Sequence, residues 1–151
     1  MNYTDAQVRT AIEGVIQSAA PLAVVYPWWV LGTKPDMWPG MLRAASDGNR
    51  VHAYVFTRSR DEGIERAMRC VDHIWTYDVW AFHYYSTGTK AANSDLTFNA
   101  ELNAVTAAFD DVATLTAALK RRRPLQWNID LNVYGAELLH FAVGSLTIDA
   151  C

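Results

Sequence analysis

The chain has 151 residues, the length of one domain, and we expect a single domain over residues 1–151. Hydrophobic residues make up 51% of the chain and charged residues 19%, so it can bury a core and is not a disordered tail. Thirteen Lys and Arg against sixteen Asp and Glu give a net charge of −3, which excludes a protein that coats nucleic acid electrostatically. Six Trp, seven Tyr and five Phe form a large aromatic share, and such side chains favour interfaces as well as cores.

Signals for export and membrane insertion are missing from the sequence. The first residues lack a basic segment followed by an apolar one, so we expect no signal peptide, and no apolar run is long enough for a membrane span. Cys70 and Cys151 are far apart and one is terminal, so we expect both to stay free of a shared disulfide. These observations predict a protein made in a reducing cytoplasm, with no membrane partner.

The first predicted element is a helix over residues 5–19. Thr4 and Gln7 have the spacing of a capping box, in which each side chain bonds the backbone N–H of the other residue. Pro21 ends the helix because the residue before a proline avoids helical dihedral angles. Helical spacing then defines one apolar face, formed by Val8, Ile12, Val15 and Ala19.

A short strand over residues 22–26 leads into a segment from Pro27 to Gly40 that is rich in proline, glycine and tryptophan. The segment cannot be one regular element, yet it is too apolar for a solvated linker. Its three indoles, Trp28, Trp29 and Trp38, must pack on this domain or on another chain. No predicted strand accounts for them, so we interpret all three as candidate interface anchors on an assembly surface.

Further strands are predicted in the middle of the chain. Residues 51–57 form a clear strand, joined to residues 41–45 by the turn signal Ser46-Asp47-Gly48-Asn49. A polar break is expected at residues 59–63. The longest β-like stretch, residues 67–85, alternates strictly as far as Val79, after which its aromatic residues take the opposite parity. We expect a bulge or bend there, in one bent strand or in two.

The second half of the chain predicts one long helix followed by two strands. Apolar residues recur at helical spacing over residues 95–120, with a second helix after Asp110 as the alternative. Strands are predicted over residues 126–134 and 138–148, around Gly135. The basic run after residue 119 either complements the dipole of the helix C-terminus or contacts phosphate or an acidic partner. Its interface candidates are Arg121, Arg122 and Arg123.

These elements predict an α+β fold. The strands cluster rather than alternate with helices, which indicates an antiparallel or mixed β-sheet with the N-terminal helix and one long helix packed on one face. Two helices cannot cover both faces of so wide a sheet. Part of the sheet is therefore expected to stay open for a partner.

The sequence contains no recognisable catalytic constellation. Asp72 and His73 are neighbours in a strand, so their side chains point to opposite faces, and Asp78 differs from His73 in parity. Metal-binding spacings, phosphate-binding glycine loops and nucleophile motifs are all missing. We therefore predict no enzyme, with no catalytic residue, no cofactor and no metal. The histidines are interpreted as partly buried residues of an aromatic sheet, namely His52, His73, His83 and His140.

In the order and length of its elements the chain resembles the tail terminator proteins of long-tailed bacteriophages. The matching stretches are residues 4–19, 51–57 with 68–85, 98–119 and 126–148. The resemblance implies a structural virion protein that forms a hexameric ring, caps the tail tube and presents a surface to the head connector. Its partners would be further copies of itself, the tail tube protein and the connector, with DNA only passing through the lumen.

The order of the elements also resembles the cone-shaped fold of the SnoaL-like and NTF2-like proteins, which enclose an apolar pocket. Those folds usually place more helix before the sheet, whereas the long helix is predicted here between strands. The alternative is thus a protein that binds or transforms a small apolar ligand. Its candidate acid–base residues would be Asp72, Asp78, His73 and His83, beside a cavity lined by Trp75, Trp80 and His83.

Overall fold

The computed structural model describes residues 3–66, 70–89, 92–110, 119–121 and 124–150. The helices in these ranges are α1 (Asp5–Ala19), α2 (Trp38–Met41) and α3 (Ser94–Asp110). The strands are β1 (Val24–Tyr26), β2 (Arg43–Ala44), β3 (Arg50–Arg66), β4 (Cys70–Tyr84), β5 (Leu119–Arg121), β6 (Gln126–Tyr134) and β7 (Glu137–Ala150). No helix within the described ranges has the length and apolar character needed to cross a bilayer.

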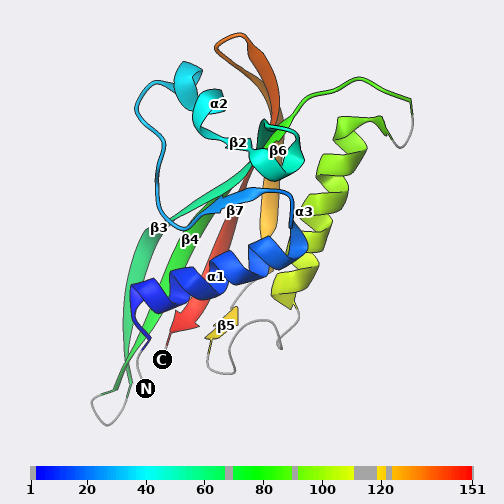
Figure 1. Ribbon diagram of the computed structural model, residues 1–151. Coiled ribbons are helices and arrows are strands. Elements are labelled where there is room, and N and C mark those ends of the chain that lie inside the picture. Colours follow the sequence, from blue (N-terminus) through cyan, green and yellow to red (C-terminus); the bar gives the residue numbers. More distant parts are fainter. Residues whose placement is uncertain (1–2, 67–69, 90–91, 111–118, 122–123, 151) are drawn as a thin grey trace.

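One mixed sheet organises the molecule (Figure 1). Its main order is β1-β3-β4-β7-β5, with β2 beside β3 and β6 beside β7. The strand β1 runs parallel to β3, and the other pairings are antiparallel. Helices and sheet together confirm the predicted α+β class.

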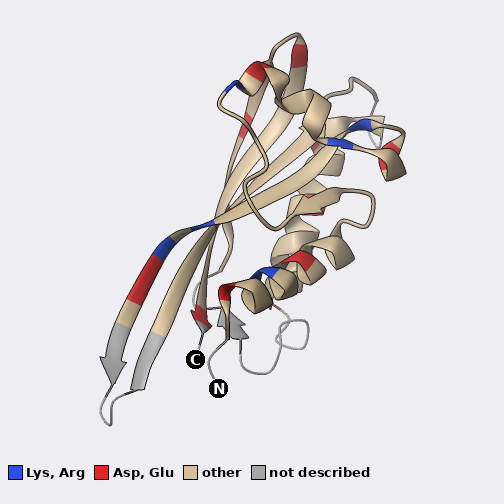
Figure 2. Cartoon of the chain, turned by 60° about the vertical axis from the view of Figure 1, so that its left-hand side comes forward, with Lys and Arg blue, Asp and Glu red and all other residues tan. Residues whose placement is uncertain are grey.

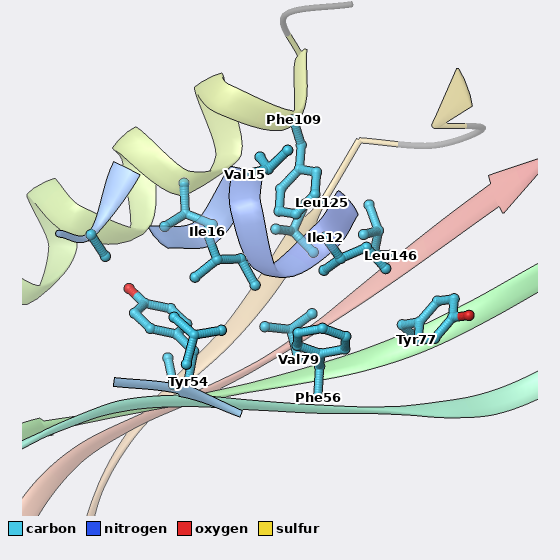
Figure 3. Close-up of a cluster of buried hydrophobic side chains, with 14 of the residues drawn as sticks. Ile12, Val15, Ile16, Tyr54, Phe56, Tyr77, Val79, Phe109, Leu125 and Leu146 are labelled. Carbon is cyan, nitrogen blue, oxygen red and sulfur yellow. The ribbon is translucent and has the colours of Figure 1, made fainter. Parts of the chain in front are cut away.

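Helices α1 and α3 pack on the same face of the sheet and build the first of two cores (Figure 3). The helix α1 starts as its sequence predicts, because Gln7 N–H donates to Thr4 Oγ1 at 3.2 Å and Thr4 N–H donates to Gln7 Oε1 at 2.9 Å. Its apolar face then meets the aromatic residues of β3 and β4. The labelled core residues include Ile12, Val15, Ile16, Tyr54, Phe56, Tyr77 and Val79.

The segment from Pro27 to Leu42 covers the upper part of the other sheet face and builds the second core. Trp38, which is only 9% exposed, stacks on Tyr134 of β6 with ring centroids 5.7 Å apart. Its indole N–H donates to the carbonyl of Gly32 at 2.9 Å, so the polar group of the ring is satisfied inside the segment. The expectation that no sheet lies under this segment is therefore wrong.

Side chains alternate between the two faces of the sheet without interruption along the described length of β4, and the predicted bulge near Val79 is wrong. Its pairing with β7 runs without a shift from His73 to Tyr84. Residues of one parity, such as Tyr77 and Val79, face the helices. Residues of the other parity, Trp80 and Phe82, face the second core. The apparent loss of alternation in the sequence arises because β4 is covered on both faces.

The polar break expected at residues 59–63 is also wrong, since β3 continues through it to Arg66. The register with β4 shifts between Arg58 and Arg60, so the bulge lies in β3 and not in β4. Pairing with β4 supplies the backbone hydrogen bonds that keep this polar stretch extended. Charged residues of β3 gather in the stretch that follows this shift, where β4 still pairs with β7, and β3 and β4 continue as a two-stranded arm past the end of β7 (Figure 2).

The predicted long helix is present as α3, but its predicted last residues, 119–120, form a strand instead. The helix α3 ends at Asp110 among the described residues, and residues 111–118 lie outside them. Residues Leu119–Arg121 form β5 beside β7, so the basic run does not extend a helix C-terminus. The backbone of Arg121 thus belongs to a strand, whereas Arg122 and Arg123 lie outside the described residues.

The hairpin of β6 and β7 confirms the last two predicted strands. Its turn places Gly135 at φ 63°, a left-handed conformation that glycine adopts without strain. A Cβ atom at this position would lie 2.9 Å from the carbonyl oxygen of Asp36. The backbone N–H of Gly135 also donates to Asp36 Oδ1 at 3.2 Å. The hairpin tip is thereby held against the Pro27–Leu42 segment.

Replacing Trp38 by Ala should destabilise the fold by about 3–5 kcal/mol, because it empties a large buried site between the segment and the sheet. Trp28→Ala is the matched control at a protein concentration low enough to keep the chain monomeric, since that side chain is mostly exposed in the single chain and should change the free energy of unfolding by less than about 0.5 kcal/mol. Urea denaturation followed by circular dichroism measures both values. Equal destabilisation by the two variants would contradict this assignment of the second core.

Candidate functional site

Two of the three predicted tryptophan anchors are on the surface. Trp28 is 58% exposed and Trp29 39% exposed, whereas Trp38 is buried in the second core and offers no anchor. Trp29 still packs edge-on against Trp80 of β4, with ring centroids 4.9 Å apart. Trp28 has no ring contact in the described part of the chain and follows directly after the edge strand β1 and Pro27. It is the most prominent apolar side chain at this edge of the sheet.

A second apolar surface lies on β6, at the opposite end of the strand order. Ile129, Leu131 and Val133 share one face of this strand and are 43–66% exposed. The start of α3 covers the neighbouring strand β7, where the ring of Phe98 stacks on that of His140 with centroids 5.5 Å apart. Helix α3 reaches β6 only near its start, where the indole N–H of Trp127 donates to Thr106 Oγ1 at 3.0 Å, and the three residues farther along the strand remain exposed among the described residues.

The apolar face of β6 borders a groove of about 370 Å³, which we call the β6 groove. It is lined by Tyr85, Ser86, Asn93, Asp95, Ile129, Asp130, Leu131 and His140. Below it, Ser94 Oγ lies 2.8 Å from His140 Nε2 and accepts from the backbone N–H of Ser86 at 2.7 Å. These bonds fix the loop before α3 against β7. The groove thus has an apolar floor, a rigid wall and, at Asp95, a carboxylate, whereas the Asp130 carboxylate bonds the backbone N–H of Leu131 at 2.8 Å.

The two apolar surfaces are separated by the full width of the sheet. The strand β1, beside Trp28, forms one edge, and β6 forms the other alongside β7. Figure 1 shows the segment after β1 on the left of the view, and the loop before α3 on the upper right. One copy of the chain therefore presents two different apolar surfaces that cannot meet each other.

A buried polar network connects α3 to the sheet. His52 Nδ1 lies 2.7 Å from Asp47 Oδ2, and its Nε2 lies 2.7 and 2.8 Å from the two carboxylate oxygens of Glu101. The hydroxyl of Tyr54 donates to Glu101 Oε1 at 2.6 Å. Arg50 Nη2 bonds the other oxygen of Asp47 at 2.7 Å. Both ring nitrogens of His52 face carboxylates, an arrangement that suits the imidazolium form because both nitrogens then donate.

The shifted pKa values in this network follow from its geometry. Burial alone lowers the pKa of His52, but the hydrogen bonds and charges of Glu101 and Asp47 outweigh it and raise the pKa above 6.5. Burial would raise the pKa of Asp47, yet the bonds from Arg50 and His52 lower it. The pKa of Tyr54 is raised well above 10 by burial and by the charge of Glu101. The charges of Arg50 and protonated His52 then balance those of the Asp47 and Glu101 carboxylates.

His83, beside this network, supplies the remaining group that could help to hold a metal. Ligand atoms of Asp47, His52 and His83 lie within 4.8 Å of one another. A cation bound there would have to displace the hydrogen bond between His52 and Asp47. Burial lowers the pKa of His83, so this ring is neutral beside the imidazolium of His52. The arrangement therefore works as an internal tie between α3, the β2–β3 turn and the sheet.

The residues of the predicted small-ligand pocket do not share one cavity. Trp75 and His83 have the parity of β4 that faces the helices, whereas Trp80 faces the second core. Asp78 shares the parity of Trp80, and the side chain of Asp72 lies outside the described residues. The alternation of side chains along β4 thus places Trp80 and Asp78 on one face of the sheet and Trp75 and His83 on the other.

Other predicted site residues are not brought together by the described structure. Arg122, Arg123 and Cys151 lie outside the described residues, and only the backbone is described for Arg121 and Cys70. Sequence reasoning missed the β6 surface and the His52 network. The alternation of Ile129, Leu131 and Val133 with polar residues was visible, but it indicates only a strand with one apolar face. Whether a helix covers that face depends on where α3 lies.

Comparisons with known proteins add no identification. No protein-family model matches the sequence, and a search of the curated proteins finds no match. The function is therefore inferred from the two apolar surfaces, the β6 groove and the buried network themselves.

The stability contributed by the His52 network should depend on pH. Because the folded pKa of His52 is raised, its contribution is complete below the unfolded value of 6.5 and is lost as pH rises through the folded pKa. The free energy of unfolding of the wild-type protein should therefore fall relative to that of His52→Asn as the pH rises through the range above 6.5. Urea denaturation across this range measures the difference.

Glu101→Gln provides the companion variant for this prediction. The amide keeps a hydrogen-bonding group near His52 but removes one of the two negative charges that raise its pKa. The fall in stability should therefore move to lower pH. Parallel pH profiles for the wild-type protein, His52→Asn and Glu101→Gln would contradict the assigned ion pairs.

Proposed function

We propose that this protein is a structural virion protein of the tail terminator kind, which forms a ring that caps the tail tube and joins it to the head connector. The observation that carries the proposal is the pair of different apolar surfaces at opposite edges of one sheet. A contact between two unlike surfaces is heterologous, and such contacts build a ring when the rotation from copy to copy closes. The exposed residues involved are Trp28, Trp29, Ile129, Leu131 and Val133.

The uncovered part of the sheet supports the same proposal. Cross-strand pairs place hydroxyl, amide and acidic side chains on the face opposite the helices, below the Pro27–Leu42 segment. They include Thr57, Thr76, Asp78, Gln126, Ser145 and Thr147. Arg60 shares this face and is paired with Glu62. Such a surface suits a channel wall along which DNA slides, because it offers little attraction for phosphate.

The two-stranded arm of β3 and β4 supplies a third surface for assembly. It extends past the end of β7, and charged residues of both signs lie on β3 where the arm leaves the sheet (Figure 2). A projecting arm of this kind is suited to contact a neighbour above or below the ring. We assign the tail tube protein and the head connector as its partners, in line with the resemblance in element order.

The proposal predicts that the purified protein assembles into a ring, with the mass of a hexamer of the 16.9 kDa chain. Light scattering after size-exclusion chromatography gives the mass, and negative-stain electron microscopy shows the ring. Assembly should persist at high salt, because contacts between apolar surfaces are not screened. A particle that stays monomeric or dimeric at high protein concentration and binds small apolar ligands would contradict the proposal and support a pocket protein.

A further inference from the structure

We infer that Trp28 of one copy docks into the β6 groove of the next copy, so that the two apolar surfaces are the halves of one repeated contact. This inference rests on the proposed ring function and names the contact that builds it. The occupant of the groove is therefore a second copy of this chain, at its Trp28 edge.

The apolar character of the two surfaces is complementary. The floor of the groove is formed by Ile129, Leu131 and Tyr85, which are exposed in the single chain. Trp28 is also exposed and makes no ring contact within the described residues. Aromatic anchors that fill a pocket on the partner are typical of the residues that dominate binding energy. Docking would remove both apolar surfaces from water in one step.

Their polar groups are complementary as well. Asp95 and Asp130 line the groove, and no described cation lines it. The segment that carries Trp28 also carries Lys34, which is exposed and forms no ion pair within the described part of the chain. The indole N–H of Trp28 makes no hydrogen bond there either, and a buried indole requires an acceptor. The carboxylate of Asp95, with its two oxygens, can accept from both groups.

The position of the two surfaces excludes contact within one copy. Trp28 follows β1 at one edge of the sheet, and the β6 groove lies at the other edge. The Trp28 that fills a groove therefore comes from a second copy. That second copy exposes its own groove to a third copy. This head-to-tail geometry forms a ring when the rotation between copies completes a full turn without a rise, and an open filament otherwise. A two-fold dimer would instead pair one surface with itself.

The test uses Trp28→Asp and Leu131→Asp in the full-length protein. Trp28→Asp destroys the anchor but leaves the groove intact, and Leu131→Asp does the reverse. Each variant alone should be monomeric by analytical ultracentrifugation. An equimolar mixture should form a dimer and nothing larger, because only one intact anchor and one intact groove can meet. No other arrangement of the contact predicts that pair of results.

Controls separate this contact from folding and from the proposed function. Asn103→Asp adds the same charge at an exposed position of α3 and should assemble like the wild-type protein. Circular dichroism shows whether each variant is folded. We expect all three to fold, because Trp28 and Asn103 are exposed and Leu131 is partly exposed.

Three outcomes would overturn the inference. If either Asp variant still forms the wild-type ring, the ring is built by another contact and only this inference fails. If the mixture of folded variants stays monomeric over the full concentration range, Trp28 and the groove are not partners. If the wild-type protein itself never associates, the proposed ring function fails together with the contact.

Discussion

The strands β3 and β4 carry large apolar side chains on both faces, so both faces of the sheet have to be covered. On one face α1 and α3 supply the cover, and on the other the Pro27–Leu42 segment supplies it over the upper part of the sheet. This need accounts for much of the aromatic content of the chain. Trp38, Trp80 and Phe82 belong to the second core, which would be exposed to water without the segment.

Polar bonds at the ends of the first core fix the helices in place. Tyr77 donates its hydroxyl hydrogen to Asp5 of α1 at 2.6 Å, and Tyr54 donates to Glu101 of α3 at the same distance. Apolar packing is not directional, whereas these bonds specify position along the sheet. His52 adds a charged tie between Glu101 and Asp47, so the position of α3 is linked to the β2–β3 turn.

The position of α3 in turn decides which strand is left uncovered. Its first turns pack over His140 of β7, and its later turns contact β6 only at Trp127, so Ile129, Leu131 and Val133 meet solvent. The pKa values of His52, Asp47 and Tyr54 are shifted because these groups are buried and bond one another in the interior. Among the residues that line the groove, His140 has a pKa that burial lowers.

Much of the local structure could be predicted because it depends on residues close together in the chain. The capping box and apolar face of α1 lie within a few turns, and Gly135 marks the hairpin between β6 and β7. The α+β class follows from the order of such elements. By contrast, the polar residues 59–63 are in a strand because β4 pairs with them, and residues 119–121 are in a strand because β7 does.

The sequence by itself determined that the chain has more aromatic surface than a simple core of this size requires, and where in the chain that surface lies. Only the tertiary structure decided which rings are buried. Trp28 and Trp38 occur in the same segment, yet one is exposed and the other is stacked on Tyr134. Ile129 alternates with polar neighbours as a buried strand residue would, yet it is exposed. The physical reason is that burial depends on which distant element lies opposite a side chain, and neither composition nor periodicity contains that information.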